Sequence, residues 1–230
     1  MRDGLVGSEM CIRDRHITIM GDSTACGEWD KTQTLLHGGT AQYLRDAGHK
    51  VISVAATGAS NKEQTEAVRG TNSDVVIWFL TDPWRDLKNA GLQHQPKTLE
   101  SYHRRREQLL KTVFNRVSDL PIWLIGGMSA VPEWVSVDHP NWRVITPDMR
   151  LWLIPDAEPI DTLARLWKYP DCDEALVDYH QQQEAMLHRH LDKARNDAAS
   201  GEHRYFWPDG RHANRQAHLK LTQELLLPLL

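Results

Sequence analysis

Hydrophobic and polar residues follow two spacings along the first half of the chain, one typical of strands and the other of helices. Short apolar runs predict strands at residues 16–20, 50–55, 74–80 and 121–125. Between them, apolar residues at helical spacing predict helices at residues 31–47, 61–68 and 98–117. The run at 74–80 is apolar on both faces, which is typical of a central parallel strand with helices on either side. This order predicts an α/β domain with a mostly parallel sheet and right-handed crossovers.

The pattern is less regular from about residue 129 to 170, where proline and tryptophan are frequent. Val144–Thr146 is the one clear strand there, which brings the expected sheet to about five strands. We interpret the rest as an insertion of long loops and short elements. Three tryptophans make this insertion a candidate lid over the substrate: Trp134, Trp142 and Trp152. Helical spacing returns at residues 174–199 and 214–227.

The first fifteen residues have neither a strand nor a helix period, and they run into the first strand without a turn signal. Residues 5–15 resemble the translation of a DNA sequencing adaptor. We therefore expect residues 1–15 to be a non-native, disordered segment and residues 16–230 to form a single domain. Because the native start of the chain would then have been replaced, the lack of a signal peptide leaves the localisation open.

Composition and charge narrow the classes of function. The chain has 230 residues, of which 40% are hydrophobic, enough for one sizeable core. Its net charge of -4, with lysine and arginine dispersed among acids, does not favour nucleic acid as a partner. No apolar run in the sequence has the length of a bilayer span. The three cysteines form neither a disulfide framework nor a metal-binding spacing, so reduced thiols are expected, and the oligomeric state is left open.

Candidate reactive residues follow three of the predicted strands and precede the last helix. These segments are residues 21–24, 57–60, 81–83 and 209–212. Ligand sites of parallel α/β sheets form at the carboxyl ends of the strands, so the four segments are consistent with one site. Asp209 is three residues from His212, which allows its carboxylate to orient the imidazole for taking a proton from a serine. Ser23, on a strand-to-helix turn, is the expected nucleophile.

Each of these features also has a purely structural interpretation. Gly-Asp-Ser is an ordinary turn sequence, and His212 or Asp209 alone is explained by packing or helix capping. A second set of residues at helical spacing would suit a metal ion: His180, Glu184 and His188. We favour a solvated helix face for this set, and also for the basic run at residues 103–106.

The first and last of the candidate segments resemble sequence blocks of the SGNH, or GDSL, hydrolase family. Residues 21–23, Gly-Asp-Ser, match the block that holds the nucleophile, although Thr24 stands where leucine is common. Gly58 matches an oxyanion-hole glycine. Residues 209–214, Asp-Gly-Arg-His-Ala-Asn, match the last block, with Ala213 in place of the usual proline. The two end blocks together are a more specific signal than either alone.

The resemblance spans nearly all of residues 16–230 and implies a flavodoxin-like three-layer α/β/α sandwich. Family members are serine esterases, lipases and carbohydrate deacetylases. The resemblance therefore implies hydrolysis of a small-molecule or carbohydrate ester with a short acyl group such as acetyl, without a metal or organic cofactor. It gives Ser23 the role of nucleophile, with His212 and Asp209 as its acid-base partners, and assigns the oxyanion hole to the backbone N–H groups of Ser23 and Gly58.

The third block departs from the family pattern. Members carry Gly-x-Asn-Asp after the third strand, with the Asn amide directed at the oxyanion, whereas residues 80–83 read Leu-Thr-Asp-Pro. With Asp82 in the Asn position, three explanations stay open. Burial keeps Asp82 protonated and able to donate a hydrogen bond; or Arg85 supplies positive charge; or the protein has lost esterase activity and is a noncatalytic binding or structural module. Further candidates for contact with substrate are Asp22, Arg85 and Trp134.

Overall fold

The computed structural model describes residues 15–29, 32, 34–87, 96–154, 157–161, 172–200, 205–206 and 212–230. Its centre is a five-stranded sheet in which every neighbouring pair of strands is parallel. In spatial order the strands are β4 (Lys50–Ser53), β1 (His16–Met20), β5 (Val75–Leu80), β6 (Ile122–Gly126) and β7 (Arg143–Thr146). This is the 2-1-3-4-5 order of flavodoxin-like folds, and it confirms the predicted parallel α/β sheet.

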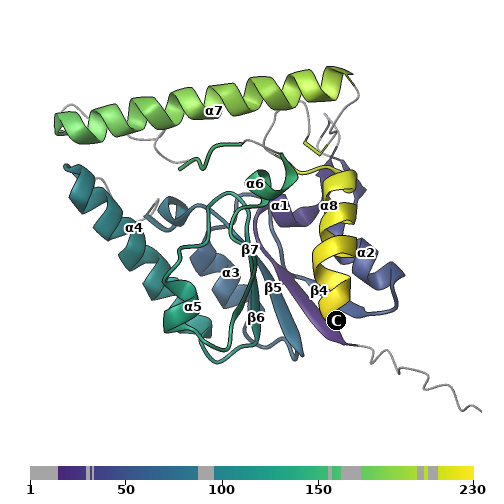
Figure 1. Cartoon of the computed structure of the whole chain (residues 1–230). Coiled ribbons are helices and arrows are strands. Elements are labelled where there is room, and N and C mark those ends of the chain that lie inside the picture. Colours follow the sequence, from purple (N-terminus) through teal and green to yellow (C-terminus); the bar gives the residue numbers. More distant parts are fainter. Residues whose placement is uncertain are drawn as a thin grey trace, which may run out of the picture.

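Helices cover both faces of this sheet, which makes three layers (Figure 1). One face carries α2 (Gly39–Asp46) and α8 (Arg215–Leu221), which pack against each other. The other carries α3 (Asn61–Val68), α4 (Leu99–Phe114) and the short α5 (Val135–Asp138). The three-layer α/β/α architecture implied by the family resemblance is therefore present.

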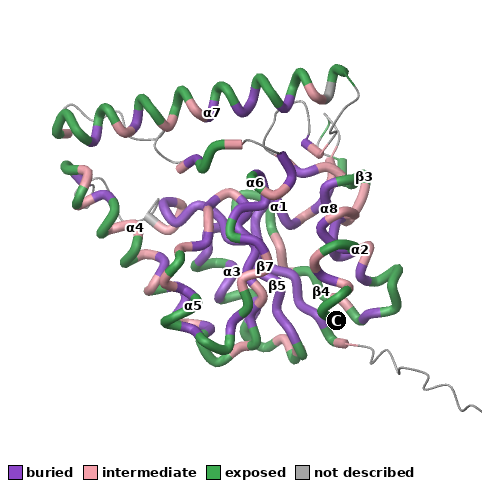
Figure 2. Tube along the Cα trace, viewed as in Figure 1, coloured by how far each residue is buried: buried purple, intermediate pink, exposed green. Residues whose placement is uncertain are grey.

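The central strand β5 divides the hydrophobic core into two parts. Its residues are buried along the whole strand (Figure 2). Ile77 and Phe79 point to the face with α2 and α8, where they join Leu44 and Leu221. Trp78 points to the opposite face and packs edge-on against Phe114 of α4 at a ring distance of 5.2 Å. Because alternate residues of a strand face opposite sides, one apolar run serves both layers.

Shorter elements complete the described chain. They are α1 (Ser23–Cys26), β2 (Glu28–Trp29), β3 (Leu35–His37), a 3₁₀ helix at Pro83–Leu87, a 3₁₀ turn at Asn115–Val117, α6 (Met149–Leu153), a π-helical turn at Thr222–Leu226 and a 3₁₀ turn at Leu227–Leu229. The long helix α7 (Glu174–Ser200) lies across the end of the molecule that also holds α1 and α6 (Figure 1). Its buried residues reach from Leu176, which packs with Trp84, to Ala194 in the core beside α8.

The predicted helix at residues 31–47 is wrong over its first half. The described part of that stretch contains β3, which pairs antiparallel with β2, and helix α2 begins only at Gly39. Two glycines make this arrangement possible. A Cβ on Gly27 would lie 2.1 Å from the carbonyl oxygen of His37, and one on Gly39 would lie 2.8 Å from the Cα of Gly27. Such a close crossing of main chains overrides the helical spacing of the apolar residues.

The described part of the predicted insertion contains regular elements. Residues 129–154 provide α5, β7 and α6, and thereby the fifth strand and part of the core. Trp142 stacks on His139 at a ring distance of 4.2 Å, and Trp152 lies under the Lys220 ammonium at 4.9 Å. Trp142 is buried and Trp152 is half-buried, and both make packing contacts in this structure. Residues 155–156 and 162–170 of the insertion, like residues 1–14 at the start of the chain, lie outside the described part.

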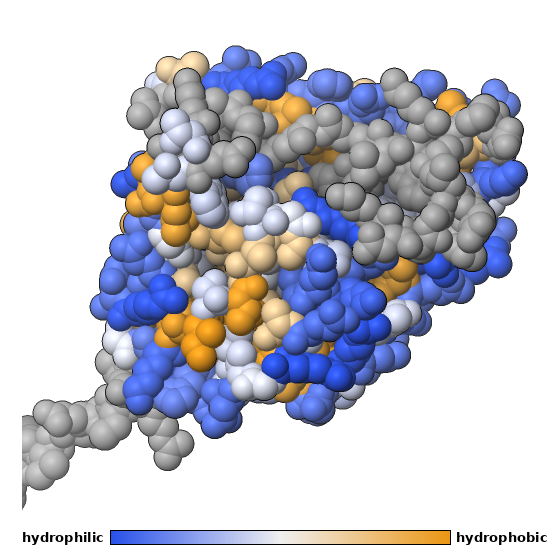
Figure 3. Space-filling model, turned by 180° about the vertical axis from the view of Figure 1, so that it is seen from behind, coloured by the Kyte–Doolittle hydropathy of each residue, from blue (hydrophilic) through white to orange (hydrophobic). Residues whose placement is uncertain are grey.

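The surface is mixed in character. The view from behind shows mostly hydrophilic side chains, with apolar areas that are separate from one another (Figure 3). Among the described residues, no helix has the length and apolar character needed to cross a membrane. Cys26 and Cys172 are free thiols, as expected.

Candidate active site

Ser23 starts helix α1 directly after strand β1. The Asp22 side chain caps this helix, because its Oδ1 accepts a hydrogen bond from the Thr24 N–H at 2.9 Å. The turn packs tightly on the sheet, since a Cβ on Gly21 would lie 2.5 Å from the Cβ of Ala25 and 2.9 Å from that of Phe79. A glycine at position 21 thus lets the serine sit close to the end of the central strands.

The His212 imidazole reaches Ser23 from the other end of the domain. Its Nε2 lies 2.9 Å from the Ser23 Oγ, although the two residues are 189 positions apart in the chain. Helix α8 holds the histidine there: Asn214 caps the helix by accepting hydrogen bonds from the N–H groups of Gln216 and Ala217. Ala217 is fully buried in the core, which fixes the helix on the sheet. A hydroxyl and an imidazole at this distance can exchange a proton.

Asp209 lies outside the described residues. The predicted contact between its carboxylate and His212 therefore stays a prediction. The short segment from Tyr205 to Phe206 is described, and the Asn214 N–H donates to the Tyr205 carbonyl at 2.9 Å. The chain on either side of the candidate acid is in this way tied to the same end of the sheet.

The Asp22 side chain binds three donors and lies inside the protein. Besides the Thr24 N–H, its carboxylate accepts the Thr81 hydroxyl at 2.6 Å and lies 3.0 Å from Nη1 of Arg85. Only 1% of this side chain is exposed. Asp22 thereby joins the turn after β1 to the turn after β5, and its predicted contact with substrate stays a prediction.

Asn61 holds the main chain after β5, a contact that the sequence did not indicate. Its Nδ2 donates to the Thr81 carbonyl at 3.0 Å, and the Thr81 N–H donates to its Oδ1 at 3.1 Å. Both residues are buried. The only local signal was the capping box of Ser60 and Glu63, which places Asn61 at the first turn of α3.

The loop after β4 carries Gly58 to the same region. The Ala56 N–H donates to the Gly21 carbonyl at 3.1 Å, which ties this loop to the turn that precedes Ser23. Gly58 has a φ of +77°, a conformation that favours glycine, and a Cβ there would meet no atom within 4 Å. The space beside Gly58 is thus open. Nη1 of Arg85 approaches the neighbouring Ala59 carbonyl at 3.4 Å.

Asp82 is buried at the end of β5. It is 4% exposed, and its Oδ1 accepts one hydrogen bond, from the Trp84 N–H at 3.1 Å. Burial raises the pKa of this carboxyl well above its usual range, and the charge of Asp161 adds to the effect. The Trp84 N–H and the guanidinium groups of Arg85 and Arg106 act in the opposite direction.

Asp161 lies under helix α7 in a cluster of hydroxyl groups. Its Oδ2 accepts the Tyr102 hydroxyl at 2.6 Å and the Tyr179 hydroxyl at 3.3 Å, and it lies 3.9 Å from Nε of Arg106. Burial, followed by the charge of Asp161, raises the pKa of Tyr102, so its hydroxyl stays a donor. The interpretation of residues 103–106 as a solvated face is thus wrong for Arg106, which points inward and donates to the Ser129 hydroxyl at 2.8 Å.

The structure does not bring Trp134 to this site. The indole packs on Phe114 at a ring distance of 5.7 Å and under the Lys111 ammonium at 5.0 Å, near the end of α4. Figure 1 shows that α5, which follows Trp134 directly, is well separated from α1. Trp134 packs against the second core, and its predicted contact with substrate stays a prediction.

The three residues considered for a metal ion differ in their burial. His180 is buried and meets the Tyr102 ring edge-on at 5.5 Å, whereas Glu184 and His188 on the same helix are exposed. Within the described residues, no group of three His, Cys, Asp or Glu side chains gathers in a way that could hold a metal ion.

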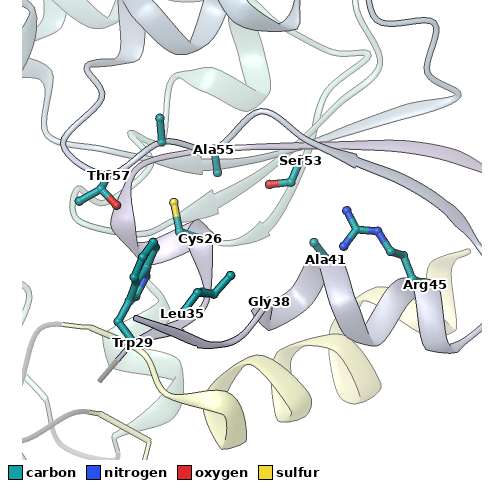
Figure 4. A pocket seen from close by; sticks show the side chains of 10 residues that line it. Cys26, Trp29, Leu35, Gly38, Ala41, Arg45, Ser53, Ala55 and Thr57 are labelled. Atoms are coloured by element: carbon teal, nitrogen blue, oxygen red, sulfur yellow. The ribbon is translucent and has the colours of Figure 1, made fainter. Parts of the chain in front are cut away.

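A cavity of about 350 Å³ adjoins the short helix of Ser23 (Figure 4). It is lined by Cys26, Trp29, Leu35, Gly38, Ala41, Arg45, Ser53, Ala55, Ala56 and Thr57. Cys26 is the last residue of α1, and Thr57 directly precedes Gly58. Burial raises the pKa of the Cys26 thiol to about 11, so this wall of the cavity is uncharged at neutral pH.

Comparison with known proteins gives structural likeness alone. No family model matches the sequence, and no curated protein matches it. An acetylxylan esterase from Geobacillus stearothermophilus is 12% identical, with 91% of each chain covered and a TM-score of 0.41. An α/β hydrolase from the metagenome of Lake Arreo in Spain is 16% identical, with 89% of this chain and 90% of that chain covered and a TM-score of 0.38. An SGNH-hydrolase family esterase is 14% identical, with 76% and 96% covered and a TM-score of 0.39. Likeness at this level does not by itself assign an activity.

Proposed function

We propose that this chain is a serine hydrolase of the SGNH, or GDSL, type, which cleaves esters through an acyl-enzyme formed on Ser23. The observation that carries the proposal is the distance of 2.9 Å between the Ser23 Oγ and the His212 Nε2. A serine hydroxyl is a weak nucleophile at neutral pH unless a neighbouring base takes its proton. The two residues come from the first and last thirds of the chain and meet at the carboxyl ends of the strands, where α/β enzymes react.

The reaction then proceeds in two halves. The Ser23 Oγ bonds to the acyl carbon while its proton passes to the His212 Nε2, and the carbonyl oxygen becomes an oxyanion. When the oxyanion collapses, the bond to the alcohol breaks and His212 returns the proton to the departing oxygen. Water repeats both steps on the acyl-enzyme, which releases the carboxylic acid and restores Ser23. Asp209 orients the imidazole by accepting its other N–H.

The oxyanion is assigned to the backbone N–H groups of Ser23 and Gly58. The hydrogen bond from Ala56 to the Gly21 carbonyl supports this assignment, because it keeps the Gly58 loop beside the nucleophile. Donors fixed before the reaction stabilise the developing charge without a cost of reorganisation. The residue in the position of the family's third donor is Asp82.

The substrate is proposed to be a small-molecule or carbohydrate ester with a short acyl group. The cavity beside α1 offers room for one part of such a substrate, since Cys26 and Thr57 on its wall are close in sequence to Ser23 and Gly58. The chemistry described above needs no metal or organic cofactor.

Hydrolysis of an aryl acetate, together with labelling by a serine-directed phosphonate, tests the proposal. The wild-type chain should hydrolyse the ester and be labelled once, and Ser23→Ala should abolish both. Ser118→Ala, at an exposed serine after α4, is the matched control and should leave both unchanged. Turnover or labelling that survives in Ser23→Ala would refute the assignment of the nucleophile.

The rival function is a noncatalytic binding or structural module that keeps the fold. Its support is Asp82, because an ionised carboxylate in the place of an amide donor would oppose an oxyanion. It predicts a folded protein that neither turns over the ester nor takes up the phosphonate. The short contact between Ser23 and His212 favours the hydrolase, since a module that only binds has no need of it.

A further inference from the structure

The carboxyl groups of Asp22, Asp82 and Asp161 lie at or under the carboxyl ends of β1 and β5. In the described part of the chain, two guanidinium groups face these three carboxyl groups. Asp22 lies 3.0 Å from Arg85. Asp161 lies 3.9 Å from Arg106 and accepts two tyrosine hydroxyls as well. Asp82 has neither a guanidinium within ion-pair distance nor a hydroxyl donor among the described residues. In the described part of the chain, Asp82 is thus the one of these three carboxyl groups that has no guanidinium within ion-pair distance.

The surroundings of Asp82 favour the neutral form. At 4% exposure the carboxyl has lost most of its hydration, and one backbone N–H, from Trp84, replaces that water. An ionised carboxylate with a single hydrogen bond in such a place is costly, whereas the acid form is not. The second carboxyl oxygen has no hydrogen-bond partner among the described residues, so an O–H there is free to donate.

The turn that carries Asp82 lies beside the turn that carries Ser23. Asp82 comes directly after Thr81, and Ser23 comes directly after Asp22. The Thr81 hydroxyl donates a hydrogen bond to the Asp22 carboxylate at 2.6 Å. The two hydrogen bonds between Asn61 and the Thr81 main chain fix the peptide that leads into Asp82. The two turns therefore lie side by side, as their strands do.

We infer that Asp82 keeps its proton at neutral pH and that its carboxyl O–H donates a hydrogen bond to the oxyanion formed on attack by Ser23. The inference rests on the proposed function. It makes Asp82 a substitute for the amide of the family's third block: one oxygen is held by the Trp84 N–H, and the other carries the donor. No proton leaves Asp82 in the reaction, so its acid form is a catalytic donor and not a general acid.

The groups that set this protonation come from several elements. Arg85 belongs to the 3₁₀ helix after Asp82, Arg106 to α4, and Asp161 to the segment before α7. Both guanidinium groups favour the ionised form of Asp82, and the Asp161 charge opposes it. His180 of α7 meets the Tyr102 ring edge-on. Burial lowers the pKa of His180 and the charge of Asp161 opposes this, so the imidazole adds no positive charge near neutral pH. Burial of Asp82 is the largest effect and decides the direction.

The pH profile of kcat/KM for an aryl acetate is the first test. In the wild type, kcat/KM should rise with pH as His212 loses its proton and fall at higher pH as Asp82 loses its proton. The profile is then bell-shaped. Asp82→Asn supplies an amide donor that does not titrate, so its profile should lack the alkaline fall. Asp82→Ala removes the donor and should reduce kcat by about 100- to 1,000-fold, with Asp82→Asn recovering most of that loss. Asp119→Asn, at an exposed carboxyl, should leave the bell-shaped pH profile unchanged.

Three results would overturn the inference. One is a wild-type rate without an alkaline fall. Another is an Asp82→Asn rate as low as that of Asp82→Ala. The third is a rate in Asp82→Asn far above wild type at neutral pH, which would mean that an ionised carboxylate had been a handicap. Each of these leaves the Ser23→Ala result, and thus the proposed function, untouched.

A second measurement does not depend on turnover. Infrared difference spectra of Ser23→Ala against Ser23→Ala with Asp82→Asn, at pH 7, should show the C=O band of one protonated carboxyl that the second protein lacks. Circular dichroism checks that both are folded. A carboxylate band in place of the acid band would overturn the inference even if the protein hydrolyses no ester.

Discussion

Asn61 forms two hydrogen bonds with the main chain of Thr81, one in each direction, at 3.0 and 3.1 Å. Asn61→Ala leaves a buried carbonyl and a buried N–H without partners, which should lower the free energy of unfolding by about 2 to 4 kcal/mol. Because the released peptide precedes Asp82, the rate of ester hydrolysis should fall as well. Urea unfolding and kcat/KM check the two effects. Asn72→Ala, at an exposed loop position, is the control, and equal stability of the two variants would contradict the argument.

Gly21 and Gly70 offer a matched pair for backbone crowding. A Cβ on Gly21 would overlap the Cβ atoms of Ala25 and Phe79, whereas one on Gly70 would meet no atom within 4 Å, although both glycines have positive φ. Gly70→Ala should therefore cost about 1 kcal/mol for its backbone alone. Gly21→Ala should cost about 1 to 3 kcal/mol more and should also displace Ser23. Thermal unfolding and phosphonate labelling measure this; a Gly21→Ala protein that is as stable and as reactive as Gly70→Ala would refute the packing at Gly21.

His218 should make the fold sensitive to mild acid. It is fully buried, its Nδ1 lies 3.0 Å from the Thr40 hydroxyl, and burial lowers its pKa to about 4. Between the ordinary value near 6.5 and this one, the unfolded chain binds a proton that the folded chain does not, so the free energy of unfolding rises with pH. The contribution is on the order of 3 kcal/mol, complete above pH 6.5 and lost as the pH falls toward 4.

Urea unfolding between pH 4 and 7.5 tests this linkage. His218→Leu should flatten the dependence over that window by about one proton, even if it is less stable at pH 7.5 because the Thr40 contact is lost. His188→Asn, at an exposed histidine, should keep the wild-type slope. An unchanged slope in His218→Leu would show that other groups cause the acid sensitivity.

The cavity beside α1 should limit the size of the substrate. Ser53 lines it, whereas Ile52, the preceding residue of β4, points to the other side of the strand and lines a separate hollow. Ser53→Phe should raise KM about tenfold for an acetylated sugar while leaving labelling by a small phosphonate unchanged. Ile52→Phe should do neither. Equal KM values in the two variants would place the substrate elsewhere.

Local signals in the sequence were sufficient for most elements. The bounds of α3 agree with prediction because its capping box, Ser60 and Glu63, lies within four residues. Strand β5 was predictable for a similar reason, since six consecutive apolar residues admit few alternatives. The hairpin of β2 and β3 was not, because its cause is the crossing of Gly27 and Gly39, which are twelve positions apart and read separately as ordinary glycines.

The residues of the candidate site likewise divide into those with a local signal in the sequence and those without one. Ser23 and His212 could be predicted because each stands in a short motif beside a predictable element. Asn61 and Asp161 could not, since their partners, Thr81 and Tyr102, lie 20 and 59 positions away and nothing local marks the pairing. The surroundings of Trp134 were not predictable either, because a large aromatic ring suits a core as well as a binding surface.

The contact between Ser23 and His212 joins the first crossover of the fold to its last helix, 189 positions later. A nascent chain that is still missing α8 can already pair all five strands, since these end at Thr146. It would nevertheless lack the imidazole beside the hydroxyl. Docking of the final segment is thus the step that brings the imidazole to the Ser23 hydroxyl, so a chain truncated before this segment would keep its five strands and lack this contact.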